Sequence, residues 1–210
     1  MKEQLSDEYI LAEIEKLKYP YGLNGVIRYN LTRKEPFRTQ SVAEHVANMI
    51  FLAHYFRDFE DPGHELNFEK LIKLIMVHDM GEIETGDVVT VAKGESHELL
   101  EREAIKLVRE KSPLFIAKEV ESLYEEFTNP KTKEGKYAQA IDKFEGQFFW
   151  VEKEGVEMLI EVHKTVGLDS KIVHPIHMAK VFNMLDAYNF PVIRRFLEVI
   201  EKKKYSYGII

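Results

Sequence analysis

The segment over residues 71–87 constrains the fold most, because an amphipathic helix in it ends in ionisable residues. Leu71, Leu74 and His78 follow the i, i+3, i+7 spacing of one helix face. His78 therefore continues an apolar face that is expected to be buried, and Asp79 follows it directly. Burying an ionisable group is costly unless the group is paired or bound to a metal. The segment thus predicts a helix that carries a His-Asp dipeptide to the core for a reason other than packing.

Length and composition predict a soluble globular protein. The chain has 210 residues, of which 45% are hydrophobic and 31% are charged, and this is enough for one hydrophobic core. Seven prolines and eleven glycines are few for this length, which favours long helices over many-turned β architecture. We therefore expect an all-α fold, a single domain over residues 1–210. C-terminal helices over residues 151–210 are expected to pack on the rest of this domain.

The net charge and the cysteine content limit the classes of binding partner and of metal site that we expect. A net charge of −7 argues against polymeric nucleic acid and against an anionic membrane, because no basic surplus exists to neutralise phosphates. A small anionic substrate remains compatible with this charge. The sequence has no cysteine, which excludes disulfides and thiolate metal sites. With no signal-peptide pattern and no apolar run of about 18 residues, we expect a cytoplasmic protein without a membrane partner.

Two further helices place polar residues on faces that we expect to be buried. Ser41 and Glu44 form a capping-box pattern, and the helix that they open carries His45 on one face with Met49. A helix expected over residues 132–154 carries Asp142 inward. A lone histidine on an apolar face is more often a hydrogen-bonded core residue than a ligand. The joint pattern on three helices is more specific, because two imidazoles and two carboxylates suit one divalent cation.

A second pair of histidines has the spacing of metal ligands but a weaker context. His174 and His177 are three residues apart, as two ligands on one helix can be. Pro175 between them indicates a helix start, so we expect capping or surface roles for this pair. Asn67 is expected to cap the helix that ends in His78, and residues 61–63 (Asp-Pro-Gly) are expected to form a turn.

The order of these residues resembles a known family. His45, then His78-Asp79, then Asp142 is similar to the pattern of the HD-domain metal-dependent phosphohydrolases. The stretches 41–45 (SVAEH), 77–82 (VHDMGE), 85–87 (TGD) and 140–145 (AIDKFE) resemble the 5′-deoxynucleotidase branch, which includes relatives of HD-domain-containing protein 2. The resemblance covers about residues 20–150, which would form the metal-site core, and implies an all-helical HD-domain bundle.

The resemblance also implies roles for individual residues. It implies that His45, His78, Asp79 and Asp142 are metal ligands, and that Glu82 and Asp87 are catalytic. It further implies that Arg28 orients the phosphate. The remaining residues expected near the substrate are Tyr29, Asp79, Asp87, Thr90, Glu125 and Asp142. Members of the family commonly form homodimers and use Co²⁺, Mn²⁺ or a similar ion, so we expect one divalent ion, with Mg²⁺, Zn²⁺ or Ni²⁺ as alternatives.

Departures from the family pattern bear on the substrate more than on the metal. Tyr29 stands where some members have tryptophan, and the segment over residues 87–93 lacks prolines that several members carry. The leading prediction is an enzyme that releases phosphate from nucleoside or deoxynucleoside 5′-monophosphates. The alternatives are a phosphodiesterase, a nucleoside polyphosphate hydrolase and a non-catalytic metal-binding regulatory module.

Overall fold

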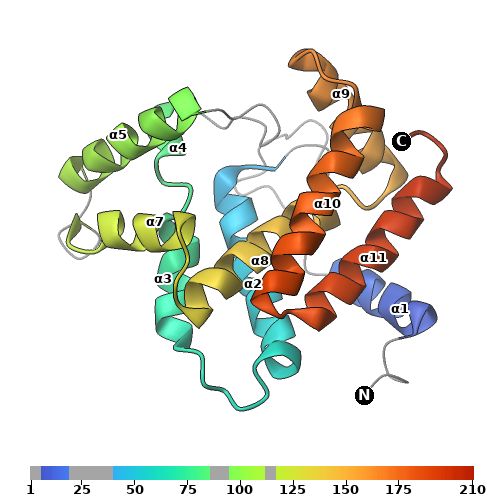
Figure 1. Cartoon of the computed structure of the whole chain (residues 1–210), viewed down its shortest axis with the longest axis horizontal. Helices are drawn as coiled ribbons and strands as arrows, with labels where there is room; N and C mark the ends of the chain where they lie inside the picture. Colours follow the sequence, from blue (N-terminus) through green and yellow to red (C-terminus); the bar gives the residue numbers. More distant parts are fainter. Residues whose placement is uncertain (1–5, 19–39, 86–94, 112–116) are drawn as a thin grey trace, which may run out of the picture. The chain divides into compact units, whose positions relative to one another are not determined.

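The computed structural model describes residues 6–18, 40–85, 95–111 and 117–210, and all regular secondary structure in these ranges is helical (Figure 1). This confirms the prediction of an all-α fold. The helices are α1 (Asp7–Lys18), α2 (Val42–Glu60), α3 (Phe68–Val77), α4 (Glu82–Thr85), α5 (Glu95–Lys111), α7 (Val120–Thr128), α8 (Lys133–Phe149), α9 (Lys153–Thr165), α10 (Ser170–Tyr188) and α11 (Pro191–Ser206).

The chain forms two compact units, one of residues 1–48 and 143–210 and one of residues 49–142. The boundaries between them fall inside α2 and inside α8. The prediction of a single domain over residues 1–210 stays a prediction. In the described part of the chain, no helix combines the length and the apolar character that crossing a membrane requires.

The first unit is built around α11, which packs against α1 and α10, while α10 also packs against α9 (Figure 1). Its core is aromatic where α8 enters it. The ring centroids of Phe144 and Phe148 lie 5.7 Å apart, and those of Phe144 and Phe196 lie 6.4 Å apart. Rings at these separations add specific contacts to the burial of apolar area. The end of α8 is therefore firmly anchored in this unit.

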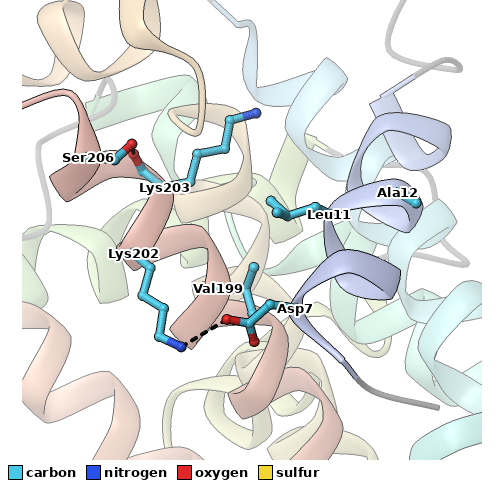
Figure 2. A pocket seen from close by; sticks show the side chains of 7 residues that line it. All are labelled: Asp7, Leu11, Ala12, Val199, Lys202, Lys203 and Ser206. Atoms are coloured by element: carbon cyan, nitrogen blue, oxygen red, sulfur yellow. Dashed lines mark hydrogen bonds and ion pairs between the residues drawn. The ribbon is translucent and has the colours of Figure 1, made fainter. Parts of the chain in front are cut away.

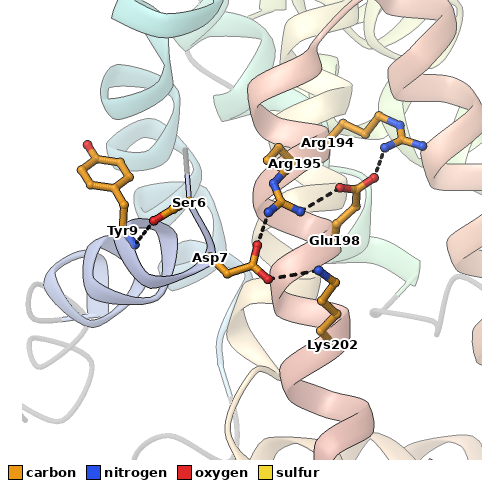
Figure 3. Close-up of polar contacts among 7 residues, drawn as sticks. All are labelled: Ser6, Asp7, Tyr9, Arg194, Arg195, Glu198 and Lys202. Carbon is orange, nitrogen blue, oxygen red and sulfur yellow. Dashed lines mark hydrogen bonds and ion pairs between the residues drawn. The ribbon is translucent and has the colours of Figure 1, made fainter. Parts of the chain in front are cut away.

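A cluster of charges joins α1 to α11 (Figure 3). Asp7, at the start of α1, accepts hydrogen bonds from the Arg195 guanidinium and, at 3.0 Å, from Lys202 Nζ. Glu198 pairs with Arg195 as well, so the four side chains form a network rather than an isolated pair. Networks on a surface are worth more than single ion pairs, which contribute little.

The second unit consists of α3, α4, α5 and α7 with the remaining parts of α2 and α8. In it, α7 packs against α3 and α5, and α4 packs against α5. Leu71, Leu74 and Ile75 of α3 are fully buried, as the periodicity of this segment predicts. The Tyr137 hydroxyl of α8 donates to the Ala53 carbonyl of α2 at 2.9 Å, which satisfies a buried polar group.

Two predicted helix starts are confirmed by their caps. The Glu44 N–H donates to Ser41 Oγ at 3.1 Å, and the Ser41 N–H donates to Glu44 Oε2 at 2.6 Å, which is a capping box. Asn67 Oδ1 accepts from the Lys70 N–H at 3.1 Å at the start of α3. The caps fix where α2 and α3 begin, and therefore which of their residues face inward.

The predicted helix over residues 132–154 is wrong at its C-terminal end. Helix α8 ends at Phe149, and α9 begins at Lys153. Gly155 in α9 lies so close to the preceding turn that a Cβ on it would come within 3.0 Å of Trp150 Cα. The absence of a side chain there allows α9 to pack back on this turn. No proline marks the break, so periodicity carried the predicted helix too far.

The prediction for His174 is also wrong. Helix α10 begins at Ser170 with Asp169 as its cap, so Pro175 lies inside the helix. His174 is buried, and its Nε2 lies 2.6 Å from Glu201 Oε2. Lys204 pairs with the same carboxylate at 3.0 Å. Burial lowers the pKa of the fully buried Lys204 ammonium, although the Glu201 carboxylate opposes this shift. These groups are paired because buried charges are costly alone.

Asp61 gives the second unit a pH-dependent contribution to stability. Burial disfavours its ionisation, but hydrogen bonds from Lys133 Nζ at 2.8 Å and the Leu66 N–H at 2.9 Å outweigh burial and hold the pKa of Asp61 below its usual value of 3.8. A lowered carboxyl pKa in the folded state adds stability above the unfolded pKa, and this stability is lost as pH falls through the lowered value.

We predict that Asp61→Asn lowers the free energy of unfolding by about 1–2 kcal/mol at pH 7, because a bond to a charged group is lost. The difference from wild type shrinks as pH falls below the usual pKa of Asp61. Urea denaturation at pH 7 and near pH 3 measures both effects. Glu65→Gln is the control, because Glu65 meets the same Lys133 at 3.4 Å but is exposed. An equal loss of stability at both pH values would contradict the prediction.

Candidate metal centre

The end of α3 presents an imidazole in a fixed tautomer. His78 follows the last residue of α3 and is 5% exposed. Its Nδ1 lies 2.8 Å from the Ile75 carbonyl oxygen. A carbonyl oxygen only accepts, so Nδ1 carries the hydrogen and Nε2 is the nitrogen with the lone pair. The Phe127 ring, with its centroid 4.6 Å from that of His78, packs against the imidazole and holds its orientation.

His78 Nε2 lies 3.0 Å from Asp79 Oδ2. In the neutral ring, this contact brings the lone pairs of a nitrogen and a carboxylate oxygen together, which is repulsive without a positive charge. A proton on Nε2 or a shared cation relieves that repulsion. Imidazole and carboxylate together are ligands that many divalent ions accept. The donor set therefore fits a divalent metal ion.

His45 joins this pair from the first turn of α2. His45, His78 and Asp79 each offer one ligand atom, and these atoms all lie within 4.8 Å of one another. Metal–ligand bonds of about 2.0–2.2 Å to nitrogen and oxygen allow one ion to reach atoms at such separations after small adjustments. The structure thus brings together three of the four residues predicted as ligands. Asp142, half-buried on α8, is not among these three, and its assignment as a ligand stays a prediction.

Glu82 follows the His-Asp dipeptide through one tight turn. The Glu82 N–H donates to the Asp79 carbonyl oxygen at 3.0 Å, so the two acids stay one turn apart along the chain. Gly81 in this turn is buried, and a Cβ on it would lie 3.5 Å from the Glu101 carbonyl oxygen of α5. The turn therefore packs closely on α5. Glu82 is half-buried at the start of α4.

Glu125, predicted near the substrate, is an exposed residue of α7. Its carboxylate accepts from Asn129 Nδ2 and from Arg102 of α5, each at 2.8 Å, and these bonds hold the pKa of Glu125 below its usual value. The contact with Arg102 links α7 to α5. The substrate role of Glu125 stays a prediction. Four other predicted site residues lie outside the described part of the chain, namely Arg28, Tyr29, Asp87 and Thr90.

One residue at this centre was missed by the sequence analysis. Glu145 of α8 is 1% exposed, and its Oε2 lies 2.6 Å from His45 Nδ1. The available signal was a carboxylate inside an apolar stripe of α8, where Ile141 and Phe148 are buried on the same face. Spacing along one helix does not reveal a partner 100 residues away, so the signal identified no role.

A recess of about 550 Å³ between α1 and α11 has a different chemistry (Figure 2). Lys202 and Lys203 line it together with apolar residues such as Leu11. Lys202 donates to Asp7 at 3.0 Å, and Lys203 donates to Glu152 at 2.9 Å. Both cations are therefore engaged with carboxylates, and the described lining offers little surplus charge for a phosphate.

Comparison with known proteins decides the family. Residues 22–180 match the sequence model of the HD domain. The chain belongs to the HD domain family. This confirms the resemblance on which the metal-ligand assignments rest. HD-domain 5′-deoxynucleotidases are among its relatives, which agrees with the branch that the motifs indicate.

Two curated relatives illustrate the match. The mouse protein named 5′-deoxynucleotidase HDDC2 is 32% identical over 111 residues, which are 51% of this chain and 53% of that protein. The 5′-deoxynucleotidase hdd1 of Schizosaccharomyces pombe is 30% identical over 125 residues, 56% and 61% of the two chains. The chain thus spans about half the length of the curated relatives it matches.

A solved structure has a similar fold over nearly the whole chain. It is a predicted metal-dependent phosphohydrolase from Magnetospirillum magnetotacticum, with a TM-score of 0.60 and 20% sequence identity. The match covers 93% of this chain and 91% of that one. The similarity of fold therefore extends beyond residues 20–150, in which the motifs were recognised.

We predict that a divalent ion stabilises the purified chain. Mn²⁺ at a free concentration 100-fold above its Kd adds about 2.7 kcal/mol, which corresponds to a rise in Tm of about 5–10 °C for a chain of this size. His45→Ala and Asp79→Ala are expected to abolish most of this rise, because each removes a ligand. Thermal unfolding with EDTA and with Mn²⁺ measures it.

The control for this experiment is His54→Ala, since His54 is an exposed histidine of the same helix α2. It should keep the full response to Mn²⁺. A rise in Tm that His45→Ala and Asp79→Ala retain would exclude these residues as ligands.

Proposed function

We propose that the chain is a metal-dependent phosphohydrolase that releases phosphate from nucleoside or deoxynucleoside 5′-monophosphates. The observation that carries the proposal is the contact of His78 Nε2 with the Asp79 carboxylate at 3.0 Å, in a tautomer fixed by the Ile75 carbonyl. An imidazole nitrogen and a carboxylate oxygen at this separation form a donor pair that suits a divalent ion. Membership of the HD domain family and relatives named 5′-deoxynucleotidases support the choice of reaction and substrate.

In this proposal, the ligands are His45, His78, Asp79 and Asp142. A divalent ion held there makes water more acidic and stabilises negative charge that develops on the phosphoryl group. Mn²⁺ and Co²⁺ are the ions that we favour, because the family resemblance implies them and because imidazole and carboxylate ligands suit a borderline or hard divalent cation.

We assign the remaining steps of the reaction to two acidic residues, Glu82 and Asp87, and to the cationic side chain of Arg28. Glu82, one turn after Asp79, accepts the proton of the water that attacks phosphorus. The bond from phosphorus to the 5′ oxygen then breaks. That oxygen takes its proton from Asp87 or, where Asp87 hydrogen-bonds the sugar instead, from a water molecule. Arg28 holds the phosphate by two parallel N–H bonds, which lysine cannot reproduce. Positioning and electrostatics of this kind supply most of the acceleration in phosphoryl transfer.

Substrate contacts beyond the phosphate are proposed for Tyr29, Thr90 and Glu125. Tyr29 offers an aromatic face to a base or a sugar. We also propose a homodimer in the cytoplasm, as the family resemblance implies and as a chain without cysteine allows. These assignments rest on the sequence resemblance.

We predict that Glu82→Gln keeps its metal but loses kcat by about 10²–10⁴-fold, the usual effect of removing a general base. Phosphate release from a panel of nucleoside and deoxynucleoside 5′-monophosphates with Mn²⁺, Co²⁺ or Mg²⁺ measures kcat, and metal analysis of the same samples measures occupancy. Glu84→Gln is the matched control, because Glu84 is an exposed acid of the same short helix α4.

The outcomes separate the alternatives. Full turnover by Glu82→Gln would remove the general-base assignment. Release of phosphate only from diesters or polyphosphates would replace the monophosphatase by another phosphohydrolase. A wild-type chain that binds metal but hydrolyses none of these substrates would favour the non-catalytic regulatory module.

A further inference from the structure

Glu145 is a carboxylate placed inside the apolar face of α8. Ile141, Phe144 and Phe148 surround it on that face, and each of them is at most 1% exposed. Glu145 itself is 1% exposed. Placing a carboxylate in such surroundings costs several kcal/mol unless hydrogen bonds compensate. The hydrogen-bond partners of Glu145 therefore show which interactions compensate the cost of burying its carboxylate.

Side chains of the first unit hold the two carboxylate oxygens separately. Gln40 Nε2 donates to Oε1 at 2.7 Å, and Asn48 Nδ2 donates to the same oxygen at 3.4 Å. Oε2 lies 2.6 Å from His45 Nδ1. The two amides fix one oxygen, and this orients the other toward the imidazole. This geometry is built by two distant segments of the chain, residues 40–48 and helix α8.

The contact with Glu145 determines the tautomer of His45. A carboxylate accepts hydrogen bonds, so His45 Nδ1 carries the hydrogen and Nε2 keeps its lone pair. In metal sites, a carboxylate on the second nitrogen of a histidine ligand fixes the ring orientation and strengthens the ligand as a base. His78 reaches the same tautomer through a backbone carbonyl. Both candidate imidazoles therefore present Nε2 as the ligand nitrogen.

We propose that Glu145 is the positioning residue of the metal centre, holding His45 in the tautomer and orientation that bind the ion. This inference rests on the proposed role of His45 as a ligand. Gln40 and Asn48 support it indirectly, because they hold the carboxylate that holds the imidazole. Glu145 contacts neither substrate nor reacting atoms in this assignment.

A purely structural role is the competing explanation, and the chain contains a matched control for it. Glu201 accepts from the buried His174 at the same distance of 2.6 Å and lies in the same unit. His174 is not in the candidate metal cluster of the described residues. A carboxylate that only stabilises the fold should behave as Glu201 does, whereas a positioning residue should also affect metal binding.

The test compares Glu145→Gln, Glu145→Ala and Glu201→Gln in the full chain. Titration calorimetry with Mn²⁺ measures Kd for the folded protein, and thermal unfolding in EDTA measures stability without metal. NMR spectra of the ring nitrogens in the metal-free protein report the tautomer of His45. We expect Kd to rise about tenfold in Glu145→Gln, which keeps the shape, and towards 100-fold in Glu145→Ala.

We expect His45 to lose its preference for a hydrogen on Nδ1 in Glu145→Ala, and Glu201→Gln to lower Tm while leaving Kd within about twofold. If Glu145→Ala fails to fold, Kd and the tautomer in Glu145→Gln decide. Wild-type Kd and tautomer in both Glu145 variants, with only Tm lowered, would overturn the positioning role alone. Equal rises in Kd in Glu145→Gln and Glu201→Gln would overturn it too. A wild-type chain that binds no Mn²⁺, Co²⁺ or Mg²⁺ would overturn the proposed metal centre and this inference together.

Discussion

The hydrogen bond from His78 Nδ1 to the Ile75 carbonyl decides the chemistry of the candidate site. It forms because His78 caps α3, where the carbonyls of the last turn have no partner within the helix. The same bond leaves Nε2 as the nitrogen that meets Asp79. A helix end that satisfies its own backbone thus leaves Nε2 of His78 as the candidate ligand nitrogen. The buried apolar side chains of α3 hold this helix end in place, and they therefore fix the position of His78 in the candidate site.

Much of this arrangement follows from local sequence. The spacing of Leu71, Leu74 and His78 predicts the buried face of α3, and the capping box at Ser41 predicts where α2 begins. These features depend on interactions within a few residues, which periodicity and cap chemistry describe well. The family motifs, which the HD domain match confirms, then identified the histidines and acids that need a common explanation.

The features that sequence reasoning missed depend on contacts between distant segments. Glu145 meets His45 across 100 residues, and His174 meets Glu201 across 27. Helical periodicity places each of these groups on a face without naming its partner. Likewise, the end of α8 at Phe149 depends on how closely Gly155 packs against Trp150. Tertiary packing overrode the local pattern in each case.

The two histidines differ in one respect that has an evolutionary consequence. The acceptor for His78 Nδ1 is a main-chain oxygen, which every substitution at residue 75 leaves in place. The acceptor for His45 Nδ1 is a side chain, which a single codon change can shorten, neutralise or remove. Substitution therefore cannot remove the hydrogen-bond acceptor of His78, whereas it can remove or change the acceptor of His45. With His45 as a ligand, as proposed, substitutions at residue 145 and at its amide partners Gln40 and Asn48 are where the preference for one ion over another could change.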